Sequence, residues 1–403
     1  FLSFDRFLGG LPAGVQLFSL LKANPDLLDL LATILGTAPR LAEQLSHRPK
    51  VLDAVLDPGF FGALPTPAEI AAQISAILPP GVPLEETIDR ARVLGKEQAF
   101  RIGVRVLSET VAAEDAGFAF SDLAALLLDR LHGAVTAENQ EKHGAIAGGR
   151  SAVIAMGKLG GREMTAGSDL DLIVVYDAPD EGAQSDGRRP LSVNQYFARL
   201  TQRLITAITT PTGEGVLYDV DMRLRPSGSK GPLATSLSAF RAYHRDSAWT
   251  WEKLALTRAR PICGDPRLID ELTQAIADSL AAPRDPDATR LDIVAMRRLM
   301  LQEHRGDGVW DIKRNRGGLV EVEFIAQTLQ LISAAQQPRV LAANTMKAFA
   351  NLESAGLLAP ADGAALRQAA GLYHRITQVL RLCVSDAYDP ATAQAGLNRI
   401  VAS

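Results

Sequence analysis

The sequence predicts a mostly helical α+β protein in which a small α/β core lies between two helical regions. Along most of the 403 residues, apolar side chains recur at intervals of three and four, which is the spacing of one helix face. Three runs near the middle, 151–157, 169–177 and 216–224, are instead short, apolar and β-branched, as buried strands are. A chain of this length is expected to form two or three domains.

The first predicted domain, residues 1–112, is helical throughout. Helical spacing is present at 15–35 and 48–57, and proline and glycine break the chain at 79–83. Helical spacing then resumes at 84–107, where acidic residues in the first turn suit a helix N-terminus.

The second predicted domain, residues 113–265, contains the three strands. A helix at about 118–141 leads into a Gly-rich joint and the first strand. Between the second and third strands, one helical face is formed by Val193, Tyr196, Phe197, Leu200, Leu204 and Ile208. The order strand, strand, helix, strand predicts a small α/β sheet.

The third predicted domain, residues 266–403, is a helical bundle. Helical periodicity is present in four segments, at 267–280, 288–304, 317–335 and 364–383. The chain opens without Met and breaks off after GLNRIVAS with no closing element, so we expect a piece of a longer polypeptide.

Composition argues against several classes of protein. The net charge of −4 offers no general attraction to a polyanion, so no nucleic-acid partner is expected. The two cysteines, Cys263 and Cys383, are too few and too far apart for a disulfide framework or a thiolate zinc site, and we expect both to be buried. No apolar run approaches eighteen residues, so we expect a cytoplasmic protein without a membrane partner.

The segment GSDLDL carries the strongest chemical signal. Side chains at positions i and i+2 of a strand share a face, so Asp169 and Asp171 are expected to point the same way. Their repulsion is unfavourable unless a divalent cation lies between them, and carboxylate oxygens are the ligands that Mg²⁺ prefers. The alternative is a strand end with two solvated carboxylates.

A Gly-rich turn precedes this pair. Gly157, Gly160 and Gly161 would let the backbone approach a phosphate closely, Lys158 adds a positive charge, and Ser168 can donate a hydrogen bond. We therefore predict these five residues to be nucleotide-binding.

A third carboxylate, Asp221, follows on the third predicted strand. Three aspartates on adjacent strands can hold two Mg²⁺ ions about 4 Å apart, and Asp221 could also help to deprotonate an attacking hydroxyl. Arg223, Arg225 and Lys230 are predicted to offset triphosphate charge. For the two arginines, structural pairing with acidic neighbours such as Asp219 is an equal alternative.

Four motifs in this order resemble the bacterial glutamine synthetase adenylyltransferases, and the resemblance covers essentially the whole chain. The motifs are GKLGGREMTAGSDLDL, YDVDMRLRPSGSKGPLAT, WTWEKLALTRARPICGD and WDIKRNRGGLVEVEF. The resemblance implies a polymerase-beta-like nucleotidyltransferase core, a regulatory or linker role for 1–112, and the C-terminal, adenylylating half of the family's two catalytic halves. It makes Asp169, Asp171 and Asp221 the catalytic, metal-binding aspartates.

The resemblance also implies substrates, cofactors and partners. ATP would donate AMP to a tyrosine of glutamine synthetase. The cofactor would be Mg²⁺, bound as two ions, and Mn²⁺ could take its place. A PII-type nitrogen signal protein and glutamine would regulate the reaction.

Three other functions stay open at this stage. One is the de-adenylylating half of the same family, which would run the chemistry in reverse with phosphate. Another is a non-catalytic regulatory module, and the third is uridylylation of a signal protein. A P-loop ATPase is disfavoured because no G-x-x-x-x-G-K-[ST] segment occurs.

Two sets of side chains receive plainer interpretations. Glu321 and Glu323 are expected near a helix N-terminus, with docking of Glu323 toward the active-site edge as the weaker alternative. Trp249, Trp251 and Trp310 are expected to pack between domains rather than to stack on adenine.

Overall fold

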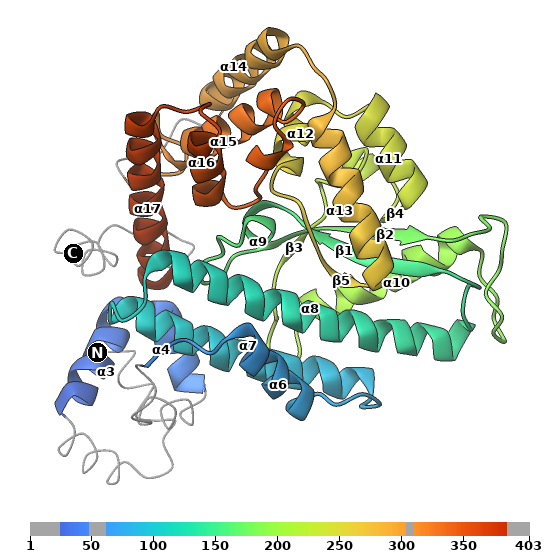
Figure 1. Cartoon of the computed structure of the whole chain (residues 1–403). Coiled ribbons are helices and arrows are strands. Elements are labelled where there is room, and N and C mark those ends of the chain that lie inside the picture. The colour runs from blue at the N-terminus through green and yellow to red at the C-terminus, as the bar shows by residue number, and fades with distance from the viewer. Residues whose placement is uncertain (1–24, 48–61, 304–309, 385–403) are drawn as a thin grey trace.

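The computed structural model describes residues 25–47, 62–303 and 310–384 (Figure 1). Helices make up most of this part of the chain, and one small mixed sheet lies among them. The predicted fold class, α+β and mostly helical, is confirmed. The helix predicted at 48–57 and the first part of the one predicted at 15–35 lie outside the described residues.

The N-terminal helices follow the predicted periodicity closely. Their bounds are α3 Pro25–Thr37, α4 Pro39–His47, α6 Pro67–Ile77, α7 Leu84–Leu107 and α8 Ala113–His143. Helix α6 begins with a capping box, because Thr66 Oγ1 accepts a hydrogen bond from Glu69 N at 3.3 Å and Glu69 Oε2 accepts one from Thr66 N at 2.7 Å.

The sheet has five strands in the order β3-β2-β1-β5, with β4 also paired to β2. Strands β1 and β2 are antiparallel, as are β1 and β5, whereas β3 and β4 both run parallel to β2. The strand bounds are β1 Arg150–Ala155, β2 Leu170–Asp177, β3 Val220–Asp221, β4 Ala234–Ser236 and β5 Arg260–Gly264.

Both faces of the sheet are buried, which explains why β1 reads as a continuous apolar run. Val153 and Ala155 belong to a core shared with helices α3, α4, α6, α7 and α8 and with α10 (Val193–Thr209). Ala152 and Ile154 face the opposite core, built mainly from α11 (Leu237–Asp246), α12 (Thr250–Leu256) and α13 (Pro266–Ala281). Figure 1 shows α8 below the sheet and α11 above it, with α13 crossing in front of the strands.

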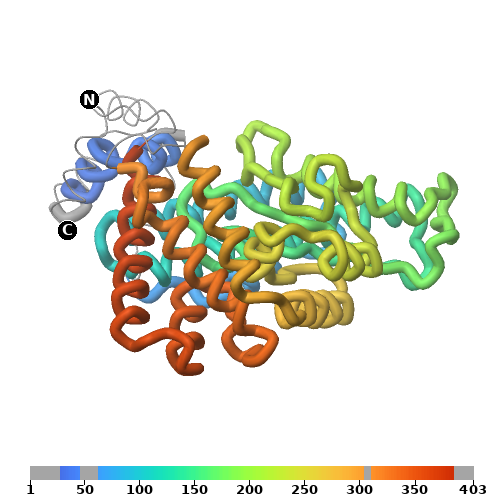
Figure 2. The backbone as a smooth tube through the Cα atoms, turned by 90° about the horizontal axis from the view of Figure 1, so that it is seen from above, coloured from blue at the N-terminus to red at the C-terminus, as the bar shows by residue number. Residues whose placement is uncertain are grey.

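The C-terminal helices form a third packing unit beside the sheet. They are α14 Pro286–Glu303, α15 Leu319–Ser333, α16 Thr345–Ser354 and α17 Pro360–Cys383, and the last three share a core around Phe349. Helix α17 returns to the N-terminal helices α4 and α7, so the two ends of the described chain lie side by side (Figure 2).

The structure corrects part of the predicted sheet. The strand predicted at 216–224 is too long, since only the two residues of β3 pair there, and β4 and β5 were not predicted. Strand β4 has only three residues, and β5 contains Pro261 and Gly264, so their sequences lack a clear strand pattern. The domain boundaries at 112 and 265 stay a prediction, and the hydrophobic cores run across both positions.

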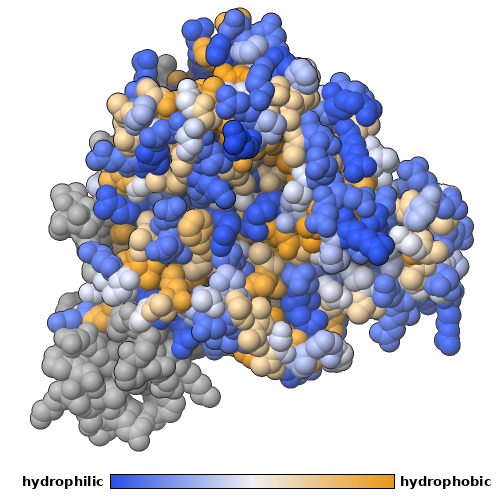
Figure 3. Space-filling view, viewed as in Figure 1, coloured by the Kyte–Doolittle hydropathy of each residue, from blue (hydrophilic) through white to orange (hydrophobic). Residues whose placement is uncertain are grey.

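The surface agrees only in part with the expectations from composition. Cys263 and Cys383 are buried and free, as predicted. Trp249 and Trp251 were expected to pack between domains, but their exposed fractions are 70% and 42%, so that prediction is wrong for both. On the face drawn in Figure 3, hydrophilic and hydrophobic residues are interspersed. None of the described helices combines the length and apolarity needed to cross a bilayer.

Candidate active site

Asp169 and Asp171 lie at the start of β2, where buried and accessible side chains alternate. Leu170 and Leu172 are buried, whereas Asp169 is exposed and Asp171 is half-buried. On the neighbouring strand, Asp221 pairs in register with Asp171. Three aspartates from two strands therefore gather at one edge of the sheet.

The surroundings of the three carboxylates differ. Burial, and after it repulsion from Asp169 and Asp221, raises the pKa of Asp171 from 3.8 to about 6. The pKa of Asp221 is lowered, mainly because Arg223 hydrogen-bonds to its carboxylate. Arg223 Nε donates to Asp221 Oδ2 at 2.7 Å, and the Arg223 backbone N donates to Oδ1 at 2.7 Å. Asp171 therefore carries a charge that the fold disfavours, and Asp221 carries one that the fold stabilises.

The three aspartates have the ligand type that a divalent cation prefers, but they do not form a complete, preformed set of metal ligands. Within residues 25–47, 62–303 and 310–384, no three His, Cys, Asp or Glu side chains converge as a complete set of metal ligands. The repulsion felt by Asp171 is nevertheless what a cation between Asp169 and Asp171 would relieve, and hard carboxylate oxygens suit Mg²⁺.

Helix α9 (Gly157–Gly161) links β1 to the aspartates. Gly157 has φ +52°, and a Cβ at this position would lie 2.2 Å from Asp171 Oδ2, so glycine is required here for space as well as conformation. Lys158 follows, and burial, with smaller contributions from Arg381 and Lys313, lowers its pKa from 10.5 to about 8. Its ammonium group is therefore mainly charged at neutral pH.

The other predicted members of the Gly-rich turn are engaged by the protein itself. A Cβ on Gly160 would lie 1.9 Å from the carbonyl oxygen of Arg258, and one on Gly161 would lie 2.9 Å from Arg258 Nη2. Ser168 is buried, and its Oγ accepts a hydrogen bond from Thr165 N at 3.0 Å. Contacts within the protein therefore explain these three residue types without a nucleotide. In contrast, Gly157 borders the Asp171 carboxylate, and Lys158 lies within electrostatic reach of Asp169.

The three predicted cations after β3 occupy different environments. Arg225 is buried, and its guanidinium donates to the carbonyl oxygens of Met222 at 2.7 Å and Pro232 at 3.0 Å, which fastens the loop between β3 and β4. Arg223 is held by Asp221 but is largely exposed, and Lys230 is exposed on the short helix η1 (Gly228–Lys230). Arg223 and Lys230 are thus accessible to a ligand, and Arg225 is committed to the fold.

Three residues near the site had no role assigned from sequence. Lys313, in the loop before α15, lowers the pKa of Asp171 and of Lys158, so it lies within electrostatic reach of both. Glu163 and Arg258 form a buried ion pair at 2.5 Å. A lysine inside a motif that resembles the family could have drawn attention to Lys313, but no local pattern marks a buried ion pair.

The comparisons with known proteins bear on this geometry. Residues 28–275, more than half of the chain, match the family described as glutamate-ammonia ligase adenylyltransferase. The chain belongs to this family. Residues 293–389 match a second family model, described as GlnD PII-uridylyltransferase. The resemblance inferred from the four motifs is thereby confirmed.

The adenylyltransferase family includes close relatives of known name. Proteins named bifunctional glutamine synthetase adenylyltransferase/adenylyl-removing enzyme are 49% identical in Rhodopseudomonas palustris (strain TIE-1), over 99% of this chain and 40% of the relative, and 47% identical in Rhizobium meliloti (strain 1021), over 100% of this chain and 41% of the relative. The chain thus spans about two fifths of the length of these relatives.

Proposed function

We propose that this chain transfers AMP from ATP to a tyrosine hydroxyl of glutamine synthetase and releases pyrophosphate. The observation that carries the proposal is the pair Asp169 and Asp171 beside Asp221, in a chain whose relatives are named adenylyltransferases. In the reaction, the tyrosyl oxygen bonds to the α-phosphorus, and the bond between the α-phosphorus and the bridging oxygen of pyrophosphate breaks. The hydroxyl proton passes to water, and the electron pair of the broken bond leaves with pyrophosphate.

Asp169, Asp171 and Asp221 are the residues that would hold two Mg²⁺ ions. Mn²⁺ could take the place of Mg²⁺. When bound, such ions polarise the phosphoryl oxygens and neutralise the leaving group. Asp221 is kept ionised by Arg223, so it suits a permanent anionic ligand better than a general base. Asp171, with a pKa raised to about 6, is still mainly ionised at neutral pH.

Four cations of the chain would position the triphosphate. Lys158 on α9 lies within electrostatic reach of Asp169, and Lys313 reaches the same site electrostatically from the loop before α15. Arg223 and Lys230 are exposed after β3. Fixed positive charge at the phosphates acts by positioning and electrostatics, which is the main requirement of phosphoryl transfer.

The reverse activity and the regulators belong to the same proposal. Because the relatives are named for adenylyl removal as well as transfer, phosphorolysis of adenylylated glutamine synthetase is the second candidate. A PII-type signal protein and glutamine are proposed as regulators, and the match of residues 293–389 to a family described by its action on PII supports a contact with such a protein.

The test is label transfer from α-labelled ATP to unmodified glutamine synthetase in the presence of Mg²⁺. The parent should label a tyrosine, and an Asp169→Asn/Asp171→Asn variant should not. The matched control is Asp246→Asn/Asp287→Asn, which removes two exposed carboxylates that pair with the neighbouring Arg245 and Arg290, and it should retain transfer.

The outcomes separate the candidates. Transfer by the double variant would exclude Asp169 and Asp171 as the metal site. Absence of transfer by the parent, together with phosphate-dependent release of ADP from adenylylated glutamine synthetase, would favour the reverse activity. Absence of both, with ATP still bound, would favour a non-catalytic regulatory module.

A further inference from the structure

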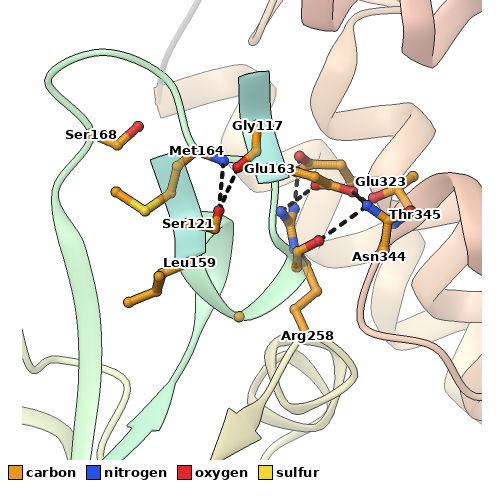
Figure 4. A network of polar contacts seen from close by, with 12 residues as sticks. Gly117, Ser121, Leu159, Glu163, Met164, Ser168, Arg258, Glu323, Asn344 and Thr345 are labelled. Atoms are coloured by element: carbon orange, nitrogen blue, oxygen red, sulfur yellow. Dashed lines mark hydrogen bonds and ion pairs between the residues drawn. The ribbon is translucent and has the colours of Figure 1, made fainter. Parts of the chain in front are cut away.

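A buried ion-pair network lies at the C-terminal end of α9 (Figure 4). Arg258, between α12 and β5, contacts Glu163 through Nη2 at 2.5 Å and Glu323 through Nη1 at 2.7 Å. Glu163 Oε1 also accepts a hydrogen bond from Thr345 N at 2.7 Å and one from Asn344 Nδ2 at 3.4 Å. The network therefore joins the end of α9 to two C-terminal helices, α15 and α16.

The network is stabilised by charge and isolated from solvent. The side chains of Arg258 and Glu163 are only 7% and 4% exposed. Burial alone would lower the pKa of Arg258, but Glu163 and Glu323 outweigh it and raise the pKa. Burial would likewise raise the pKa of Glu323, but Arg258 outweighs it and lowers the pKa. Arg258 and Glu323 are therefore both charged at neutral pH.

Arg258 also packs directly against α9. A Cβ added to Gly160 would lie 1.9 Å from the Arg258 carbonyl oxygen, and a Cβ added to Gly161 would lie 2.9 Å from Arg258 Nη2. Asn344 Nδ2 donates to the carbonyl oxygen of Gly161 at 3.1 Å. The opposite end of α9 is Gly157, against the Asp171 carboxylate. A five-residue helix is only about 7 Å long, so a shift at one end moves the other.

We propose that Arg258 is a positioning residue, which fastens α9 to α15 and α16 and thereby sets where Lys158 and Gly157 stand at the aspartate site. The ion pairs of Arg258 are with Glu163 and Glu323, and at Asp171 its charge acts only at a distance, by lowering the pKa of that carboxyl. The consequence is that the C-terminal helices act on the active site through Glu323 and Thr345. The effect expected on activity rests on the proposed adenylyl transfer, whereas the effect on α9 does not.

The loop that follows α9 has separate attachments, which makes a local test feasible. Met164 N donates to Ser121 Oγ at 3.4 Å, and Gln378 Nε2 donates to the Met164 carbonyl oxygen at 2.9 Å. These contacts to α8 and α17 do not involve Arg258. Loss of the network should therefore loosen α9 before it loosens the rest of the fold.

The experiment compares Arg258→Lys with Arg92→Lys. Lysine keeps a charge at position 258 but cannot bridge two carboxylates with a planar fork. Arg92 is also buried, and it donates hydrogen bonds to the carbonyl oxygens of Ala207 and Thr210. Neither of these bonds involves α9. Amide hydrogen exchange would be measured in a peptide covering 157–163 and in a reference peptide covering 193–209, and kcat and KM for ATP would be measured per folded molecule.

Arg258→Lys should speed exchange in 157–163 about tenfold relative to the reference peptide and lower kcat/KM about 10- to 100-fold, as loss of supporting contacts around a site typically does. Arg92→Lys should leave the exchange of 157–163 unchanged. If Arg258→Lys fails to fold, Glu323→Gln provides the same test, because it keeps the Arg258 pair with Glu163.

Two results would overturn the inference. One is equal acceleration of exchange in both peptides, which denotes a general loss of stability. The other is unchanged exchange in 157–163 with unchanged kcat/KM. If the parent transfers no label, the proposed function fails, but the exchange of 157–163 still decides the role of Arg258.

Discussion

Two groups of carboxylates lie at opposite ends of α9, and the protein balances them in opposite ways. At the Gly157 end, Asp171 is raised in pKa by burial and by the neighbouring aspartates. At the Gly161 end, Glu163 and Glu323 share the buried cation Arg258. In the first group, Arg258 and Lys313 offset only part of the burial and repulsion that disfavour the Asp171 charge, whereas both carboxylates of the second group pair directly with a buried cation.

The contrast indicates which acidic cluster serves a ligand and which serves the architecture. Buried carboxylates that already have a partner are costly to disturb but have little reason to bind a cation from solution. A carboxylate whose charge is disfavoured in the free protein marks a functional site more often. By this criterion the metal belongs with Asp169 and Asp171, and the ion pairs of Arg258 keep α9 in place.

The largest effect should come from Asp171→Asn on catalysis. Loss of a carboxylate that holds the cation should reduce the rate of adenylyl transfer by about 10³-fold, close to 4 kcal/mol in activation free energy. The rate would be measured at saturating ATP, with Asp246→Asn as the control. A rate loss of less than tenfold would show that Asp171 is not part of the catalytic centre and would contradict the functional difference between the two groups of carboxylates.

A comparable effect, on stability this time, should follow from Glu163→Ala. Removal of Glu163 leaves Arg258 with Glu323 as its remaining partner and leaves Thr345 N without its acceptor, so it should cost about 3 kcal/mol in the free energy of unfolding. The control is Glu138→Ala, whose partner Arg203 is partly exposed and whose loss should cost below about 1 kcal/mol. Urea denaturation gives both values, and equal costs would contradict the architectural role of Glu163.

In the metal-free protein, Asp171→Asn should change the free energy of unfolding by a smaller amount than Glu163→Ala and in the opposite direction. Because the folded-state pKa of about 6 lies above the ordinary 3.8, ionised Asp171 destabilises the fold fully above pH 6, and the penalty disappears as the pH falls to about 4. The variant should therefore be more stable than the parent by about 1–3 kcal/mol at pH 7.5. Thermal unfolding in a chelator at pH 7.5 and pH 4 tests this, and a variant that is less stable at both values would contradict it.

The smallest effect should come from Arg223→Gln. Loss of its exposed charge should raise KM for ATP about tenfold. Since Arg223 lowers the pKa of Asp221, the acid side of the pH–rate profile should also move to higher pH. Arg245→Gln, which removes an equally exposed arginine beside an aspartate, should change neither quantity. An unmoved acid limb in Arg223→Gln would show that Asp221 does not control the rate.

The sequence by itself predicted the features that depend on neighbours along the chain. Helix α7 begins and ends where the periodicity placed it, and the alternation in β2 puts Leu170 in the core and leaves Asp169 accessible. Both follow from the fixed geometry of a helix and of a strand, which recurs every few residues. The motifs around them were enough to indicate the family.

Tertiary structure alone decided which distant residues meet. It placed Asp221 in register with Asp171 on a strand of two residues, committed Arg225 to the loop before β4, and left Trp249 exposed. It also joined Glu163, Arg258 and Glu323 into one network. The physical reason is that a buried charge takes its partner from whichever elements the hydrophobic cores bring together, and no local periodicity encodes that choice.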